Sequence, residues 1–349
     1  MLGIFRYILA VMVAISHFTK DFLWWQGAYA VFSFYTISGY LMCLVLNESY
    51  LGGKGKLYYL ANRILRIFPA YWTAFLAAVF LYFVYGGIDF SVSRYGLLYQ
   101  QINPVPGDLP SLLGNITLLW PWDTQLAISQ AWSLRIELVF YVLMVFLTKS
   151  FRVVFAWIAV SIGLVWLMAL SSTPFLERYT SLTGSSFAFS IGAGVYFMRR
   201  YFRLSTVHIY AASAAFIAHL ILAPYLWGFD RHYSGFADFF ARETLGLYGS
   251  TVLGAYLLWA ILDQLPKHSE HRTIKSVDRY LGKIAYAVFL CHWIAASIVV
   301  AAGVDSLNMA VYVPAAFITT NILAIGLYQF VERPIESTIR MNIRHRVGK

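Results

Sequence analysis

The sequence predicts an all-α integral membrane protein, a bundle of about ten transmembrane helices with both termini in the cytoplasm. The first observation is composition: of 349 residues, 60% are hydrophobic and 12% are charged, whereas soluble domains carry about 25% charged residues. The second is that apolar stretches recur along the whole chain, close to the roughly 20 residues that a helix needs to cross the hydrocarbon core. The third is that positive charge gathers in alternate loops.

The apolar stretches predict the individual helices. The first stretch carries Arg6 and His17 and lacks a clear small-residue cleavage site, so we expect a retained helix rather than a signal peptide. The sixth stretch is short and contains glycine. The predicted spans lie at about 2–19, 28–47, 70–85, 130–148, 153–170, 185–198, 207–223, 245–263, 284–302 and 310–331.

Most of the 26 lysines and arginines belong to one set of alternate loops. The positive-inside rule places this set, and with it both termini, in the cytoplasm. We therefore expect a single transmembrane domain over 1–349 in the inner (cytoplasmic) membrane, with core spans from 2 to 331, a short basic cytoplasmic tail at 332–349, and no appended soluble domain. The basic set comprises residues in 54–66, 149–152, 199–203, 267–283 and 333–349.

Cysteine usage and charge distribution exclude several classes of protein. Cys43 and Cys291 lie in apolar stretches, and the sequence has neither a disulfide framework nor a zinc-binding pattern, so no metal is expected. The net charge of +10 follows the loop asymmetry. Nucleic acid is therefore not an expected partner, whereas membrane lipids are. The proline-bearing segment at about 86–129 is too broken to cross the membrane and is expected to form an external lid or interfacial loop.

Arg6 and His17 share one face of the first predicted helix. They are eleven residues apart, which is about 20° more than three full helical turns and about 16 Å along the axis. Considered singly, Arg6 would be interpreted as an interfacial snorkelling residue and His17 as a residue that hydrogen bonds between packed helices. Their shared face favours a groove in which Arg6 binds an anion at the cytoplasmic end and His17 supplies a base deeper in the membrane.

Six motifs follow one another along the chain. The first runs from Arg6 to His17, the third is basic, and the last lies near the C-terminus. In order they are RYILAVMVAISH at 6–17, FYTISGY at 34–40, NRILRIFPAYW at 62–72, AWSLRIELVFYVL at 131–143, LGKIAYAVFLCHWI at 281–294 and VERP at 331–334. Together they resemble, in order and over nearly the whole chain, the motifs of the acyltransferase-3 family of membrane acyltransferases.

The resemblance implies a reaction. An acyl group, expected to be acetyl, moves from cytoplasmic acyl-CoA to a hydroxyl of an envelope or exported glycan, lipid-linked or polymeric, such as a lipopolysaccharide or an exopolysaccharide. Acyl-CoA is then a co-substrate, and no permanently bound cofactor is expected. His17 is the expected catalytic base, because an imidazole titrates near neutral pH. Direct transfer and a covalent acyl-enzyme both remain open.

Two further arginines, Arg63 and Arg66, are placed by the sequence in a cytoplasmic loop just before the third span. Together with Arg6 they form the expected acyl-donor-binding set, because a guanidinium offers a bidentate fork to phosphate. The alternative interpretation is that they serve only as a topology signal.

The fourth span contains Glu137, and an ionised carboxylate at that depth needs a partner. Ser133, Glu137 and Tyr141 are spaced by four residues and share a helix face. Glu137 is the second expected catalytic residue, orienting His17 or stabilising its imidazolium. A structural polar clamp between helices is the alternative. Arg135 lies about 200° around the helix from Glu137, and the sequence assigns it no role.

The remaining candidates are expected to line or support the pocket. Tyr286 and His292 lie near one face of the ninth span, where His292 also reads as a buried, hydrogen-bonded histidine. Ser38 belongs to the second motif, and Ser133 and Tyr141 complete the set.

Two rival functions remain open. A proton-coupled transporter or carrier of a glycan-related substrate would use buried histidine, glutamate and arginine as a relay, although no inverted repeat supports that class. A non-catalytic subunit of a glycan-assembly machine is the other. Neither rival predicts acyl transfer by the purified protein.

Overall fold

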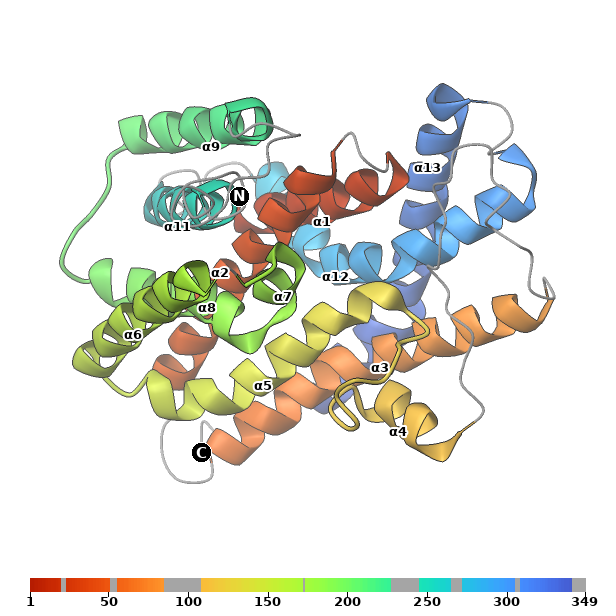
Figure 1. Cartoon of the computed structure of the whole chain (residues 1–349), viewed down its shortest axis with the longest axis horizontal. Helices are drawn as coiled ribbons and strands as arrows, with labels where there is room; N and C mark the ends of the chain where they lie inside the picture. Colours follow the sequence, from red (N-terminus) through yellow and green to blue (C-terminus); the bar gives the residue numbers. More distant parts are fainter. Residues whose placement is uncertain are drawn as a thin grey trace. The chain divides into compact units, whose positions relative to one another are not determined.

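A computed structural model describes residues 1–19, 23–50, 55–84, 108–171, 173–226, 245–264, 272–304 and 308–340. This described part is almost entirely helical and contains no β-strand (Figure 1). The prediction of an all-α protein is therefore confirmed for these residues. The N-terminal helices are α1 (Leu2–Phe18), α2 (Trp24–Glu48), α3 (Gly55–Val84), α4 (Leu109–Thr117), the 3₁₀ turn η3 (Ser129–Ala131) and α5 (Trp132–Leu147).

The second half of the chain continues the helical pattern. Its helices are α6 (Phe151–Leu170), α7 (Phe175–Thr180), α8 (Leu182–Met198), α9 (Thr206–Leu226), α11 (Leu247–Gln264), α12 (Arg272–Ala301) and α13 (Met309–Leu327). Three short segments then extend α13 without a break in the helical chain. They are the π-helical η6 (Tyr328–Glu332), α14 (Arg333–Ile335) and the π-helical η7 (Glu336–Arg340).

Each predicted span overlaps a helix of the structure. Among the described residues, seven helices are long and apolar enough to cross a membrane, whereas α1 and α8 are apolar but shorter. The chain is thus an integral membrane helical protein. The number ten, the cytoplasmic placement of both termini and the single-domain organisation stay predictions.

The structure corrects three boundaries. Arg63 and Arg66 lie inside α3 rather than in a loop, and α12 begins at Arg272, well before the predicted start near 284. Basic residues end an apolar stretch without ending a helix, because Lys and Arg are good helix formers. The predicted tail from 332 is helical as far as Arg340, and 341–349 lie outside the described residues.

The segment that the sequence predicts to be external is described only in part. Residues 85–107 lie outside the described part of the chain, while α4 begins at an Asp108 cap whose carboxylate accepts from the Ser111 backbone N–H. The prediction of a lid or interfacial loop at 86–129 therefore stays a prediction, and its residues 86–107 lie outside the described part of the chain.

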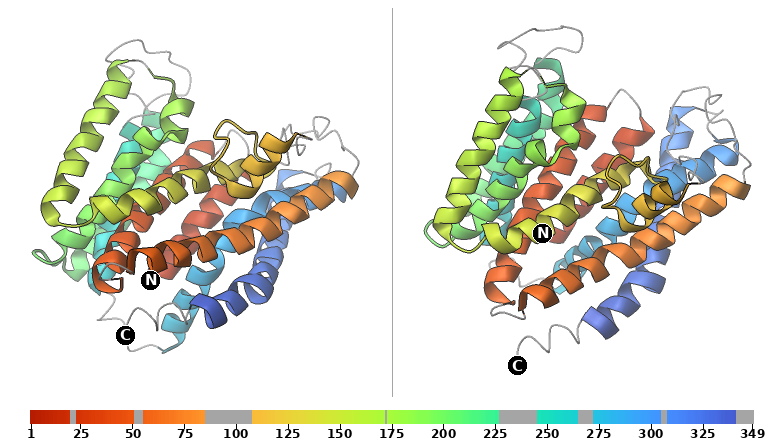
Figure 2. Two further views of the ribbon diagram at one scale, coloured as in Figure 1. Left: turned by 90° about the horizontal axis from the view of Figure 1, so that it is seen from below. Right: turned by 60° about the horizontal axis from the view of Figure 1, so that its bottom comes forward.

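The chain divides into two compact units. The first unit comprises Met1–Phe5, Ala28–Lys56 and Val139–Arg279, and the second unit comprises Arg6–Gly27, Leu57–Leu138 and Tyr280–Lys349. In the first unit, α6 packs along α8 and α9 packs along α11 (Figure 2). The second motif, on α2, belongs to the first unit, whereas Arg6, His17 and the fifth motif belong to the second.

Close backbone contact joins α2 and α8 in the first unit. A Cβ atom added at Gly39 would overlap the backbone carbonyl of Phe189, and one added at Gly192 would overlap the carbonyl of Thr36. Small residues let membrane helices approach through their backbones, where dispersion contacts replace the missing hydrophobic driving force. The glycine of the FYTISGY motif is therefore explained by helix packing.

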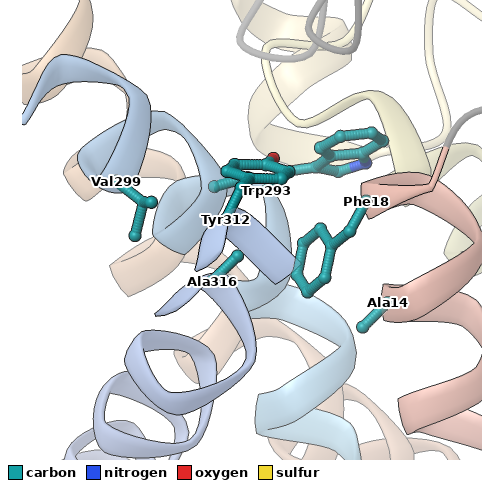
Figure 3. Close-up of a cluster of buried hydrophobic side chains, with 7 residues drawn as sticks. Ala14, Phe18, Trp293, Val299, Tyr312 and Ala316 are labelled. Carbon is teal, nitrogen blue, oxygen red and sulfur yellow. The ribbon is translucent and has the colours of Figure 1, made fainter. Parts of the chain in front are cut away.

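An apolar cluster in the second unit packs around the C-terminal end of α1. Phe18 of α1, Trp293 of α12 and Tyr312 of α13 are its large members (Figure 3). The rings of Phe18 and Tyr312 meet edge to face, with centroids 6.2 Å apart. The smaller members are Ala14, Ala296, Val299 and Ala316. This cluster fixes the end of α1 that carries His17.

Arg135, to which the sequence assigned no role, is a buried clamp. Its guanidinium donates to the backbone carbonyls of Trp122 and Thr124, the latter at 3.1 Å, and its charge lies over the Trp122 ring at 6.0 Å. Peptide carbonyls carry partial negative charge and stabilise a buried cation through charge-assisted hydrogen bonds. Arg135 therefore fastens the segment that follows α4 to α5.

Candidate active site

His17 lies in the last turn of α1, and its imidazole is half-buried. The same uninterrupted helix carries Arg6, also half-buried, near its first turn. Both residues belong to the second unit. Because α1 is continuous from Leu2 to Phe18, the helical geometry assumed for Arg6 and His17 applies along the whole interval.

The structure brings His17 together with His292, 275 residues later in the chain. Nδ1 of His17 and Nε2 of His292 are 3.0 Å apart, a hydrogen-bond distance. The ring planes are within 2° of parallel and the ring centres are 5.1 Å apart. The two rings therefore meet through their nitrogen-bearing edges, as an N–H···N hydrogen bond requires.

His292 is completely buried, at 0% exposure. Its Nδ1 lies 2.6 Å from the backbone carbonyl oxygen of Phe289, one turn earlier in α12. Both ring nitrogens of His292 are thus engaged, one by the backbone and one by His17. This geometry agrees with the interpretation of His292 as a buried, hydrogen-bonded histidine. One of its two hydrogen-bond partners is His17, the expected base.

Aromatic side chains enclose the pair. The Trp293 ring lies against His17 with centroids 4.6 Å apart and a tilt of 34°, and Phe18 meets His292 at 6.3 Å. Trp293 and Phe18 also belong to the apolar cluster of Figure 3. Sequence reasoning did not single out Trp293, although its place next to His292 in the fifth motif was a usable signal.

A second missed residue is Gln130, in η3 at the entrance to α5. Its side chain is 4% exposed, and Nε2 donates to the carbonyls of Phe289 at 3.3 Å and Leu290 at 3.1 Å. Gln130 therefore ties the start of α5 to the turn of α12 that carries His292. The predicted supporting residue Ser133 is buried and donates to the Gln130 carbonyl at 3.0 Å, so Ser133 holds this turn.

Arg66 and Tyr286, both predicted site residues, also lie together. The Arg66 guanidinium lies over the Tyr286 ring at 5.3 Å, and the Tyr286 hydroxyl donates to the Ile67 carbonyl at 3.0 Å. Arg66 forms a salt bridge with Glu332, whose side chain is only 5% exposed. Glu332 belongs to the VERP motif, but no sequence pattern linked it to an arginine 266 residues away.

The remaining predicted residues fall into two groups. Arg63 is half-buried on α3 with its charge 5.4 Å from the Tyr59 ring centre, and Glu137 is half-buried on α5 in the second unit. Ser38 and Tyr141 belong to the first unit. The roles assigned to Glu137, Ser38 and Tyr141 stay predictions.

Metal ligands do not gather in the described part of the chain: its His, Cys, Asp and Glu residues form no group of three or more that could hold an ion. The site described here is a histidine pair walled by aromatic rings, with an arginine farther along α1. A half-buried neutral imidazole can take a proton from a hydroxyl group.

Residues 2–329 match a family model described as an acyltransferase domain. The chain belongs to the acyltransferase-3 family. Comparison with curated proteins and with solved structures gave no match. The protein is thus a membrane acyltransferase, and the resemblance to this family is confirmed by a match that contains the first five motifs.

In this acyltransferase, the matched region contains Arg6, His17, Gln130 and His292. Glu332, the partner of Arg66, lies three residues beyond the matched region. The histidine pair is the arrangement in the described structure best suited to proton transfer, because it places an imidazole at a half-buried position among aromatic rings.

Proposed function

We propose that this acyltransferase moves an acetyl group from acetyl-CoA to a hydroxyl of an envelope or exported glycan, with His17 as the general base. The observation that carries the proposal is the hydrogen bond between His17 and the buried His292. A hydroxyl is a poor nucleophile until a base removes its proton. An imidazole oriented by a second side chain is the arrangement that general-base catalysis uses.

The reaction balances without an additional reagent. The acceptor oxygen attacks the thioester carbonyl carbon while the His17 imidazole takes the hydroxyl proton. The carbon–sulfur bond then breaks, the acetyl group stays on the acceptor oxygen, and the imidazolium returns its proton to the CoA sulfur. A covalent acyl-enzyme would split this exchange into two steps, and glycan-dependent release of CoA in a single turnover distinguishes the routes.

The arginines supply the donor site in this proposal. Arg6 lies on α1 about 16 Å from His17 by helical rise, and Arg63 and Arg66 lie on α3 in the same unit. Three guanidinium groups suit the phosphates of CoA, which bind arginine through two parallel hydrogen bonds. Glu332 and Tyr286 hold the Arg66 guanidinium in place. The donor then enters from the cytoplasmic side of the inner membrane.

The test compares two histidine variants in the purified, detergent-solubilised protein. His17→Ala removes the base and should lower the rate of acetyl transfer from acetyl-CoA by about 10²–10⁴-fold. His208→Ala is the matched control, because His208 lies in the first unit and hydrogen bonds Ser205, and it should keep the wild-type rate.

Two results would overturn the proposal. An equal rate in both variants would show that His17 is not the general base. If the wild-type protein transfers no acetyl group to any surface glycan, the proposed reaction is wrong. Mass spectrometry of surface glycans from cells with and without the protein identifies the acceptor. The expected difference is one acetyl mass per modified sugar.

A further inference from the structure

The backbone of α12 decides where the protons of the histidine pair lie. A carbonyl oxygen only accepts hydrogen bonds, so the short contact from His292 Nδ1 to the Phe289 carbonyl, at 2.6 Å, requires a proton on Nδ1. A neutral imidazole carries one N–H, so Nε2 of His292 carries a lone pair. That nitrogen faces Nδ1 of His17 at 3.0 Å, and His17 must therefore donate from Nδ1.

The same reasoning fixes the reactive nitrogen of His17. With its proton on Nδ1, the lone pair of His17 lies on Nε2. No described residue other than His292 hydrogen bonds the His17 ring. A charged ring is costly in these apolar surroundings, so the neutral pair is the resting arrangement. Its two N–H groups then point in one direction, from His17 through His292 to the backbone.

We infer that His292 is a positioning residue that fixes the tautomer and orientation of His17, so that Nε2 of His17 is the atom that takes the acceptor proton. The catalytic part of this inference rests on the proposed function; the proton placement stands independently of it. His292 never touches the substrate in this scheme. It acts through the hydrogen bond to His17, as an orienting side chain does in other base-assisted nucleophilic enzymes.

Gln130 extends the arrangement by one residue. Its neighbours at Nε2 are two carbonyl oxygens, of Phe289 and Leu290, so the amide must present its NH₂ group to them. Gln130 therefore donates to the same Phe289 carbonyl that accepts the hydrogen bond from His292. A continuous series of hydrogen bonds thus runs from Gln130 at the start of α5 through the Phe289 carbonyl and His292 to His17.

The kinetic test uses a pair of substitutions at one position. His292→Gln keeps both functions, because the amide oxygen accepts from His17 and the amide NH₂ donates to the Phe289 carbonyl. His292→Phe keeps a planar apolar ring but offers no acceptor. We expect His292→Phe to lower kcat by about 10²–10⁴-fold with KM for acetyl-CoA unchanged, and His292→Gln to recover at least tenfold of that loss.

A spectroscopic measurement on the full-length protein does not depend on activity. Nitrogen-15 NMR of histidine-labelled protein distinguishes a proton on Nδ1 from one on Nε2, and His17→Ala assigns the His17 signals. Wild type should show His17 protonated on Nδ1, and His292→Phe should move that proton toward Nε2. His292→Gln should keep it on Nδ1.

The outcomes separate this inference from the proposed function. Wild-type His17 with its proton on Nε2, or His292→Phe with the kcat of His292→Gln, would overturn the positioning role. If wild type transfers no acetyl group but His17 carries its proton on Nδ1, the reaction is wrong while the proton placement holds. If His292→Phe fails to fold, the wild-type spectrum and the His292→Gln rate still decide the question.

Discussion

Two buried polar clusters, one in each unit, are built in opposite ways. In the first unit, the Asp263 carboxylate on α11 accepts from Arg199 at 2.8 Å, Arg203 at 3.1 Å, Trp259 at 3.0 Å and the Leu204 backbone N–H at 2.9 Å. In the second unit, the His17 imidazole has a single hydrogen-bond partner among the described residues. The hydrogen-bonding capacity of the Asp263 carboxylate is filled, whereas one ring nitrogen of His17 has no hydrogen-bond partner within the described part of the chain.

The difference separates a structural role from a chemical one. A buried charge is tolerated only where partners satisfy it, and Asp263, with a side chain 2% exposed, is satisfied from both oxygens. Arg199 also donates to the Tyr40 hydroxyl at 2.7 Å, which brings in the end of the FYTISGY motif. Chemistry instead needs a group with an unused lone pair beside a space that a substrate can reach.

Loss of the Asp263 charge should cost the protein more stability than any other substitution considered below. Asp263→Asn should destabilise the protein by about 3–5 kcal/mol, because it leaves the buried part of the Arg199 charge uncompensated. Unfolding in detergent, followed by circular dichroism, measures the change. Arg203→Met is the matched control: the Arg203 side chain is 71% exposed, so its loss should cost at most about 1 kcal/mol. Equal stabilities for the two variants would contradict this account of the cluster.

Substitutions of Arg6 and His17, at the two ends of α1 in the second unit, should have different effects. Arg6→Ala should weaken acetyl-CoA binding by about 10- to 150-fold, which corresponds to about 1.5–3 kcal/mol for a charge-assisted contact to phosphate. Arg6→Lys should recover part of the loss, because lysine lacks the fork. His17→Ala should instead lower kcat and leave binding nearly unchanged.

Calorimetric titration with CoA measures these affinities directly. If Arg6→Ala binds CoA as tightly as wild type does, Arg6 is not a donor ligand. Its position at the start of α1 then has the simpler explanation of an interfacial snorkelling residue.

A weaker loss of stability should follow from disturbing the backbone contact between α2 and α8 in the first unit. Gly39→Ala should destabilise the protein by about 1–2 kcal/mol, because the new methyl group would overlap the Phe189 carbonyl. Gly163→Ala on α6 is the matched control, with no atom within 4 Å of its added Cβ. It should be neutral or stabilise by up to about 1 kcal/mol, since alanine favours helix. Destabilisation of equal size at both glycines would show that contact between Gly39 and the Phe189 carbonyl is not the cause.

The sequence alone predicted the helical membrane class, a helix at every predicted span, and the family. Each of these depends on local pattern: apolar length sets a helix that can cross a bilayer, and six ordered motifs identify the family. The common face of Arg6 and His17 is local as well, because it follows from the helical repeat. Helix starts were misjudged at α3 and α12, where basic residues interrupt apolarity but continue the helix.

Only the tertiary structure revealed the partners. His17 meets His292 across 275 residues, Arg66 meets Glu332 across 266, and Gln130 meets the Phe289 carbonyl across 159. Backbone hydrogen bonds within a helix join residues four apart, so a sequence pattern can predict them. Contacts between helices depend on which faces pack together and at what height, and that is set by the fit of many side chains at once.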